Sequence, residues 1–404
     1  MKRKVLAAVL GAAMVVSMMG TSVFAAEETE AATEAATEAA TEAATEAAEG
    51  ETEAAEGETE AAGETLDFSN VTANEPYTFE ILVKSYQSSY WQAAVQGIEQ
   101  EAEKLGVTVN CTGPNLETDI ADQVNMLNNA INSAPDGIGL APNDQQAVLE
   151  SLQTAADNGI PVVCFDAGVP DAPEGSVYST IATNNYAAGE IAAEHLYDAL
   201  KDKIANATEP VRIGEVNQEA TSESIIQRGL GFIDKMIELV SADGKTVAVT
   251  GNDYYVDNCA DKGDEASADV IIEVAVPAQS TVELCATEAS NIMNKADTIG
   301  MFGSNQVSAE GILTANSNLS VLGTDPEANI LAVGFDAGAT IKGAITDGTM
   351  LGAVTQSPMV MGQRTVDVLT MIANGEEVTD IPTDGYWYDT TNMEDPEIAP
   401  NLYD

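Results

Sequence analysis

The chain has 404 residues, enough for two or three domains, and its 45% hydrophobic content is sufficient for sizeable cores. Fifteen Lys and Arg stand against 66 Asp and Glu, which gives a formal net charge of -51. Such a charge repels DNA, RNA and anionic membranes, and therefore disfavours nucleic-acid binding. The single histidine, His195, excludes multi-His metal sites. It lies in a segment with an amphipathic helical pattern, where we expect a structural role.

The N-terminus has the pattern of a secretory signal peptide. It has a basic start, an apolar run and a small-residue exit at residues 23–25. We expect residues 1–25 to be removed and the mature protein to be exported, to the cell surface or the periplasm. An uncleaved membrane anchor is the alternative, because the apolar run approaches the length that spans a bilayer. No cysteine lies near the expected cleavage point, so we expect no lipid attachment.

Residues 26–75 are expected to form an acidic, disordered spacer. Residues 27–64 contain 14 glutamates and neither lysine nor arginine, in cycles of "EAAT" and "GETEAAE". Like charges without aromatic or branched apolar side chains cannot build a core. We interpret the spacer as a tether for the folded part.

After Pro76, short apolar runs alternate with segments of helical period. This alternation indicates successive strand–helix units and parallel sheets. In the first series we expect strands at residues 77–85, 107–111, 136–142 and 160–168, separated by helices at 91–106, 118–135 and 143–159. A second, similar series begins at residue 212 and ends at residue 338, with an irregular acidic insertion at residues 251–270. The sequence therefore predicts two similar open sheets.

Polar residues follow several of the predicted strands. In parallel sheets, ligands bind outside the carboxyl ends of the strands, so these residues are candidates for a site. The candidates are Lys84, Ser88, Asn143, Asp166, Asn305, Asp336 and Gln356. Any one of them can instead cap the following helix. Together with the aromatic pair Tyr90 and Trp91 they indicate a sugar site, because carboxylates and amides bind vicinal hydroxyls while aromatic faces cover the apolar face of a sugar ring.

With these residues in view, the chain resembles the type I periplasmic binding proteins of the ribose and galactose group. The resemblance covers residues 76 to about 390 and includes "SYQSSYWQAAVQGIEQEAEKLG", "IPVVCFDAG", "VGFDAGATIKGAI" and "AVTQSPMVMGQ". It implies an α/β fold of two Rossmann-like lobes with parallel sheets, joined by a three-segment hinge, with the ligand between them. The implied N-terminal lobe comprises residues 76–185 plus 357–382, and the C-terminal lobe residues 186–356 plus 383–404.

The resemblance also implies a set of ligand-binding residues. Tyr90 and Trp91 match its stacking aromatics, and Ser88 matches the polar position two before that pair. Asp166 matches its first-lobe hydroxyl acceptor, and Arg228 the arginine of its R-x-x-G-F motif. The remaining members match second-lobe and hinge contacts. The full set is Ser88, Tyr90, Trp91, Asp166, Arg228, Asn305, Asp336 and Gln356.

Three positions depart from the pattern of ribose-binding proteins. Ala167 and Ile226 stand where those proteins carry arginines, and Ser280 stands near a second-lobe aromatic position. D-Ribose itself is therefore disfavoured. A neutral sugar or polyol fits the two carboxylates of the set, and so does a cationic amino sugar.

The resemblance implies an extracytoplasmic solute-binding protein that delivers a small polar ligand, most simply a monosaccharide, to an ABC transporter permease. It implies no cofactor, no metal, no catalysis and a monomeric state. A sensor, for example for a furanosyl autoinducer, is an alternative. A glycoside hydrolase with Asp166 and Asp336 as its carboxylate pair is a further alternative. Its two carboxyls must flank one glycosidic bond, whereas both aspartates are better explained as hydroxyl acceptors on opposite lobes. Transcription repressors share this fold, but they carry N-terminal DNA-reading helices where this chain has an export signal and a spacer. We therefore exclude a repressor function.

Four cysteines and an Asp-rich insertion remain. We expect Cys111 and Cys164, at the ends of buried strands, to be free thiols. Cys259 and Cys285 bracket an irregular acidic segment, and export permits a disulfide between them, although spacing alone leaves the pairing open. The insertion lacks the spacing of a Ca²⁺ loop, so we interpret it as a solvated segment.

Overall fold

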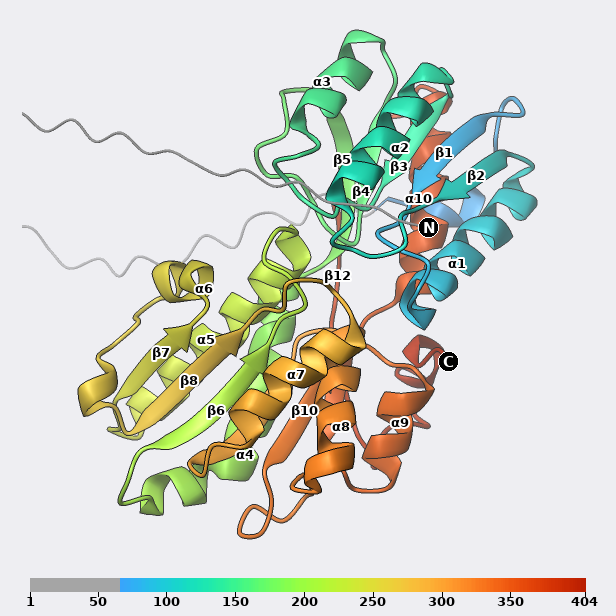
Figure 1. The fold of residues 1–404 in the computed structure, drawn as a ribbon. Helices are drawn as coiled ribbons and strands as arrows, with labels where there is room; N and C mark the ends of the chain where they lie inside the picture. The colour runs from blue at the N-terminus through green and yellow to red at the C-terminus, as the bar shows by residue number, and fades with distance from the viewer. Residues whose placement is uncertain (1–65) are drawn as a thin grey trace, which may run out of the picture. The chain divides into compact units, whose positions relative to one another are not determined.

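The computed structural model describes residues 66–404 (Figure 1). The predicted signal peptide, residues 1–25, and residues 26–65 of the predicted spacer lie outside the described residues. No helix within residues 66–404 has the length and apolar character needed to cross a membrane.

The first sheet has six strands, all parallel, in the order β12-β5-β4-β3-β1-β2. Its strands are β1 (Thr78–Leu82), β2 (Thr108–Thr112), β3 (Gly137–Leu140), β4 (Val162–Phe165), β5 (Val177–Thr183) and β12 (Ile381–Thr383). Strands β3 and β4 are buried along their whole length, as expected where helices cover both faces of a parallel sheet.

Helices cover both faces of this sheet. On one face lie α1 (Ser89–Leu105) and α10 (Pro358–Ala373), and on the other α2 (Ile120–Asn132) and α3 (Leu149–Asp157). Neighbouring residues of a strand point to opposite faces, so Ile81 packs with α1 and α10 while Leu82 packs with α2. Helix α1 ends at Gly106, whose left-handed backbone (φ 72°) forms the C-terminal cap.

The second sheet has seven strands in the order β13-β11-β10-β9-β6-β8-β7, and only β13 is antiparallel to its neighbour. Its strands are β6 (Val211–Val216), β7 (Val247–Gly251), β8 (Val270–Ala275), β9 (Thr298–Gly303), β10 (Leu331–Phe335), β11 (Gly352–Thr355) and β13 (Tyr386–Tyr388). Strands β5, β8, β12 and β13 were not predicted from the sequence. Strand β8 lies between β6 and β7, so it is an internal strand of the sheet.

Helices α4 (Asn185–Asn206) and α5 (Glu223–Ala242) pack on one face of the second sheet. Helices α7 (Val282–Met293), α8 (Gln306–Leu319) and α9 (Ala339–Thr346) pack on the other. The acidic insertion contains the short helix α6 (Asp253–Asn258) and one 3-10 turn (Glu265–Ser267), so it is not wholly irregular. The remaining 3-10 turns are Phe68–Asn70 and Ala399–Asn401.

We call the six-stranded sheet with its helices the first lobe and the seven-stranded sheet with its helices the second lobe. The chain crosses between them from β5 to α4, from β11 to α10 and from β12 to β13. The predicted fold class, two α/β units with parallel sheets and three connecting segments, is confirmed. Two of the crossings are tied together, because the Thr183 hydroxyl donates to Gln356 Oε1 at 2.9 Å.

One expectation from the sequence is wrong, and one pairing that the sequence left open is decided. The predicted spacer does not extend to residue 75 as a disordered segment, because Phe68 packs under the Arg364 guanidinium and Asn374 bonds the backbone of Thr72 and Asn74. The disulfide considered between Cys259 and Cys285 is not formed, and both are free thiols. Cys259 packs against the core on the α4 and α5 face of the second sheet, whereas Cys285 lies in the core on the α7 and α8 face.

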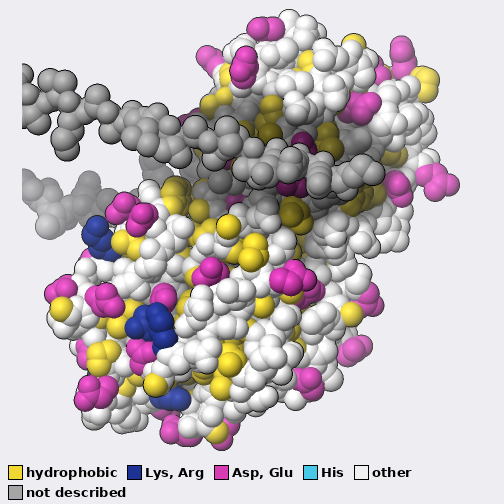
Figure 2. Space-filling view, in the orientation of Figure 1, with side chains coloured by type: hydrophobic (Ala, Val, Ile, Leu, Met, Phe, Trp, Pro, Cys, Tyr) yellow, Lys and Arg dark blue, Asp and Glu magenta, His cyan; other side chains and the backbone are white. Residues whose placement is uncertain are grey.

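The surface is acidic, in line with the composition. Figure 2 shows Asp and Glu side chains spread over the visible face, with few Lys or Arg among them. Within residues 66–404 no cluster of three or more His, Cys, Asp or Glu side chains is placed to hold a metal ion. His195 stacks on Trp387, with ring centroids 3.8 Å apart, which gives it the structural contact expected of it.

Candidate functional site

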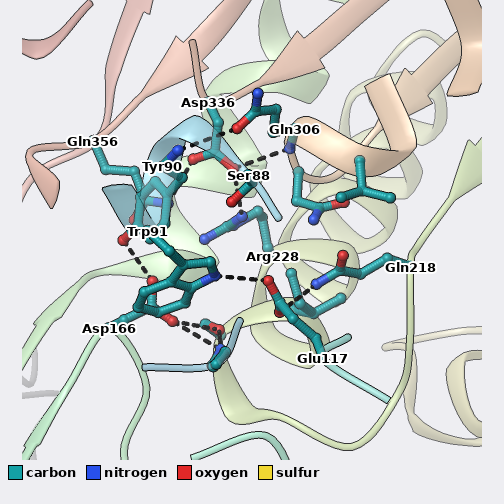
Figure 3. A pocket seen from close by; sticks show the side chains of 15 residues that line it. Ser88, Tyr90, Trp91, Glu117, Asp166, Gln218, Arg228, Gln306, Asp336 and Gln356 are labelled. Carbon is teal, nitrogen blue, oxygen red and sulfur yellow. Dashed lines mark hydrogen bonds and ion pairs between the residues drawn. The ribbon is translucent and has the colours of Figure 1, made fainter. Parts of the chain in front are cut away.

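A pocket lies where the carboxyl ends of strands from both lobes meet (Figure 3). It is lined by Lys84, Ser88, Tyr90, Trp91, Glu117, Asp166, Gln218, Ser224, Ile225, Arg228, Asn305, Gln306, Val307, Asp336 and Gln356. Its free volume is about 20 Å³, which is room for about one water molecule. In this arrangement side chains from the two lobes fill most of the space between them.

The two aspartates of the pocket occupy equivalent positions in the two lobes. Asp166 follows β4 and Asp336 follows β10, each within the sequence Phe-Asp-Ala-Gly. Both have left-handed backbones, with φ of 64° and 70°. Few residues other than glycine adopt this conformation, and it costs free energy unless the surroundings hold it. Here it turns each chain sharply at the strand end, with the carboxylate in the pocket.

Asp166 forms a buried ion pair that the sequence analysis did not identify. Lys84 Nζ lies 2.7 Å from Asp166 Oδ2 and 2.8 Å from Ser224 Oγ, and the Tyr90 hydroxyl donates to Asp166 Oδ1 at 2.5 Å. Burial alone would raise the pKa of Asp166, but the Lys84 ammonium and the Tyr90 hydroxyl outweigh it and hold the pKa below its usual value. Lys84 therefore supplies a cation beside Asp166, where the sequence comparison suggested that cations had been lost.

Asp336 has weaker charge compensation. Arg228 Nη1 lies 4.0 Å from Asp336 Oδ2, while the same guanidinium donates to Ser304 O at 2.8 Å and stacks on the Phe335 ring at 3.6 Å. Asp336 accepts from Gln356 Nε2 at 2.7 Å and from the Gln306 backbone N–H at 3.0 Å. Burial is the largest influence and raises the pKa of Asp336, with Arg228 opposing it.

Trp91, in helix α1, is held by a carboxylate from the loop between β2 and α2. Its indole Nε1–H donates to Glu117 Oε1 at 2.8 Å, and Gln218 Nε2 donates to Glu117 Oε2 at 2.6 Å. Figure 3 shows this chain of three side chains, with the indole nitrogen directed at Glu117. The Tyr90 ring packs edge-on against Trp91, with centroids 4.9 Å apart.

All eight residues predicted as a ligand-binding set line this one pocket. The structure thus brings together side chains that lie up to 268 positions apart in the chain, since the set runs from Ser88 to Gln356. Asn305 also has the capping role that we weighed for it, because its Oδ1 accepts from the Ser308 backbone N–H at the start of α8. Whether the eight residues bind a ligand stays a prediction.

Several pocket residues were outside the predicted set: Lys84, Glu117, Gln218, Ser224, Ile225, Gln306 and Val307. Lys84 was weighed as a residue after a strand but was not carried into the set. Gln218 closely follows β6, so the same rule would have found it. Glu117 lies in the loop between β2 and α2, several residues beyond the strand, where neither periodicity nor strand ends give a signal.

The lobes are joined by direct hydrogen bonds around the pocket. Besides the contacts of Lys84 with Ser224 and of Glu117 with Gln218, Glu223 Oε2 accepts from the Gly168 backbone N–H at 2.6 Å. The pocket walls thus offer carboxylate and amide groups for hydroxyls, an ammonium and a guanidinium, and two aromatic rings. This combination is suited to a small, polyhydroxylated molecule held from both sides.

Known proteins resemble this chain over most of its length. It is 24% identical over 310 residues to the ribose import binding protein of Bacillus subtilis, an alignment that covers 77% of this chain and 86% of that protein. Among solved structures, an ABC transporter solute-binding protein from Agrobacterium vitis with bound D-fucose is similar with a TM-score of 0.67 at 27% identity, covering 81% of this chain and all of that one.

A carbohydrate transporter solute-binding protein from Agrobacterium radiobacter in complex with D-arabinose shares the fold, with a TM-score of 0.65 at 23% identity over 82% of this chain and all of that one. The sequence profile of the periplasmic binding protein domain matches residues 79–377. Since this match spans both lobes and the pocket between them, the chain belongs to the periplasmic binding protein family.

Proposed function

We propose that this protein is an extracytoplasmic solute-binding protein that captures a monosaccharide between its two lobes and delivers it to the permease of an ABC importer. The observation that carries the proposal is the pocket itself, where Asp166 and Trp91 of the first lobe face Asp336 and Arg228 of the second. A ligand there contacts both lobes at once, so its binding free energy favours their approach.

The relatives support a sugar as the ligand class. The Bacillus subtilis relative is named for ribose import, and the two solved structures hold D-fucose and D-arabinose. Each of these ligands is a small molecule whose hydroxyls can bond to carboxylates and amides. The relatives are named for binding and transport, and we assign no catalytic step to the cleft.

Binding requires the lobes to move apart and close again. A free volume of about 20 Å³ cannot hold a sugar ring, so the ligand must displace the direct contacts between the lobes and take over their hydrogen bonds. The three connecting segments are the natural place for this rotation, and they coincide with the lobe boundaries that we propose: residues 76–185 plus 357–382, and residues 186–356 plus 383–404. The importer would then recognise the closed form.

The eight residues of the predicted set are proposed as ligand contacts, joined by Lys84 and Glu117. We further propose that the exported protein acts as a monomer, since one chain supplies every residue that lines the pocket.

A thermal-shift screen tests this function. The protein is first unfolded and refolded to remove carried-over ligand, and is then screened against aldopentoses, aldohexoses, deoxy sugars, amino sugars, inositols and the furanosyl autoinducer. A ligand at 100 times its dissociation constant stabilises the folded state by about 2.7 kcal/mol, which raises the unfolding midpoint by several degrees. We expect a shift with one or a few monosaccharides, and no shift with any sugar would refute the proposal.

A further inference from the structure

Glu117 occupies an unusual place in the pocket. It comes from the first lobe, is 8% exposed, and accepts hydrogen bonds from Trp91 of its own lobe and from Gln218 of the second. It therefore both orients the indole and connects the lobes. When the lobes separate, its contact with Gln218 is broken and water reaches the carboxylate.

The charges that line the pocket do not balance when Glu117 is ionised. The lining includes the carboxylates of Glu117, Asp166 and Asp336 and the cations of Lys84 and Arg228. Asp166 forms an ion pair with Lys84 at 2.7 Å, and Asp336 lies 4.0 Å from the Arg228 guanidinium. Among the ion pairs of residues 66–404, none includes Glu117 within 4.0 Å. The closed pocket thus has one carboxylate more than it has cations.

The charged groups that face Glu117 do not remove this excess. Burial has the largest effect on Glu117 and raises its pKa from 4.5 to about 7. Lys84 opposes the rise, whereas Asp166 and Glu219 add to it. An ionised carboxylate that is buried without a counter-charge is costly, so the group gains a positive partner or a proton.

We propose that Glu117 determines the charge of the ligand that the cleft accepts, because closure around a ligand takes up one positive charge at this side chain. A neutral sugar binds together with a proton, an amino sugar brings its own ammonium, and anionic sugars such as uronates are rejected. The proposal rests on the proposed function, and it assigns to Glu117 a role in specificity.

The direction of the pH effect follows from the two states of the cleft. With the lobes in contact, as in the structure described here, burial raises the pKa of Glu117 to about 7. Exposure of the carboxylate to water in the open form lowers its pKa toward the ordinary value of a glutamate. The closed form therefore binds more protons, so the affinity for a neutral sugar is highest at low pH and falls as the pH rises through about 7. Between pH 5 and pH 8 we expect a loss of at least tenfold for a neutral sugar and a smaller loss for its amino analogue.

Isothermal titration calorimetry in buffers of different ionisation enthalpy measures the protons taken up on binding. The probes are the neutral sugar that gives the largest thermal shift in the screen above, its amino-deoxy analogue and its uronate. At pH 7 we expect about half a proton per neutral sugar, since a group with a pKa near 7 is then half protonated in the closed form. The amino sugar should bind with little or no uptake, and the uronate should bind at least tenfold more weakly than the neutral sugar.

Two variants separate this role from a structural one. Glu117→Gln keeps an oxygen for the Trp91 indole but cannot take up the proton, so it should bind the neutral sugar with little pH dependence. Glu283→Gln, a change of the same kind at an exposed residue in the first turn of α7, should retain the wild-type uptake. Unfolding midpoints without ligand establish that both variants are folded.

The proposal is overturned if the wild-type protein binds its neutral sugar without proton uptake, or if Glu117→Gln takes up as many protons as the wild type. If Glu117→Gln does not fold, equal proton uptake with the neutral sugar and its amino analogue in the wild-type protein overturns it as well. Failure of the proposed function looks different, because no sugar in the screen would then shift the unfolding midpoint.

Discussion

Replacing Lys84 by methionine should weaken ligand binding much more than it weakens the fold. Lys84 and Asp166 form the tightest ion pair of the pocket, at 2.7 Å, with side chains only 2% and 5% exposed. In the Lys84→Met variant, closure buries the Asp166 carboxylate without its cation. Breaking a buried pair by removing one partner typically costs about 3 to 5 kcal/mol.

We expect a value at the lower end of this range, because the Tyr90 and Ser224 hydroxyls still contact Asp166 at 2.5 and 3.4 Å. About 3 kcal/mol corresponds to a loss of roughly 100-fold in affinity. Separation of the lobes would expose Asp166 to water, where an ion pair contributes only about 0 to 1 kcal/mol. The unfolding midpoint without ligand should therefore change little.

Calorimetric titration of the sugar found by thermal shift measures this loss. In Lys84→Met, the largest influence that opposes burial is lost and the pKa of Asp166 rises, so binding should recover partly as the pH is lowered from 7 to 5. The double variant Lys84→Met/Asp166→Asn should lose less than the sum of the single losses, because it buries no charge. Lys201→Met, which removes an exposed lysine paired with Asp198, is the control. Affinity of Lys84→Met within about threefold of the wild type would refute the reasoning.

Three further outcomes are expected. Asp336→Ala should weaken binding by about 1 to 3 kcal/mol, because its amide and backbone partners are left without an acceptor, and unchanged affinity in calorimetry would remove Asp336 from the site. Trp91→Phe should abolish most of the fluorescence change on sugar binding, since Trp91 lines the pocket and Trp387 does not; a variant that keeps the full signal would contradict this. Gly231→Ala should lower the unfolding midpoint, because its added methyl would lie 2.1 Å from a backbone oxygen of α4 and overpacking costs about 1 to 3 kcal/mol. Gly343→Ala, with no atom within 4 Å, should leave the midpoint unchanged or raise it, and equal midpoints for the two variants would count against tight packing of α4 on α5.

The sequence predicted the architecture because that information is local. Strands and helices alternate with distinct periods, and the carboxyl ends of parallel strands converge whatever the details of packing. Asp166 and Asp336 were therefore identifiable as candidates from their positions after apolar strands. The same rule placed Gln356 beside them, and it explains why the predicted set lies in one pocket.

Some features were missed. The residues of strand β8, Val-Ile-Ile-Glu-Val-Ala, carry the β-branched signal of a strand, but it was overlooked beside the Asp-rich insertion. Its position in the sheet between β6 and β7 has no local signal. Spacing could not decide the pairing of Cys259 and Cys285, because it does not reveal that they lie on opposite faces of one sheet.

The sequence by itself determined the class of fold, the two repeated lobes and the polar residues at the strand ends, since each depends on short-range patterns. Only the tertiary structure decided how those residues are partnered. It placed Lys84 on Asp166, 82 positions away, and brought Glu117 between Trp91 and Gln218 of the other lobe. The physical reason is that burial and charge compensation depend on which distant segments meet, and these determine the electrostatic character of the cleft.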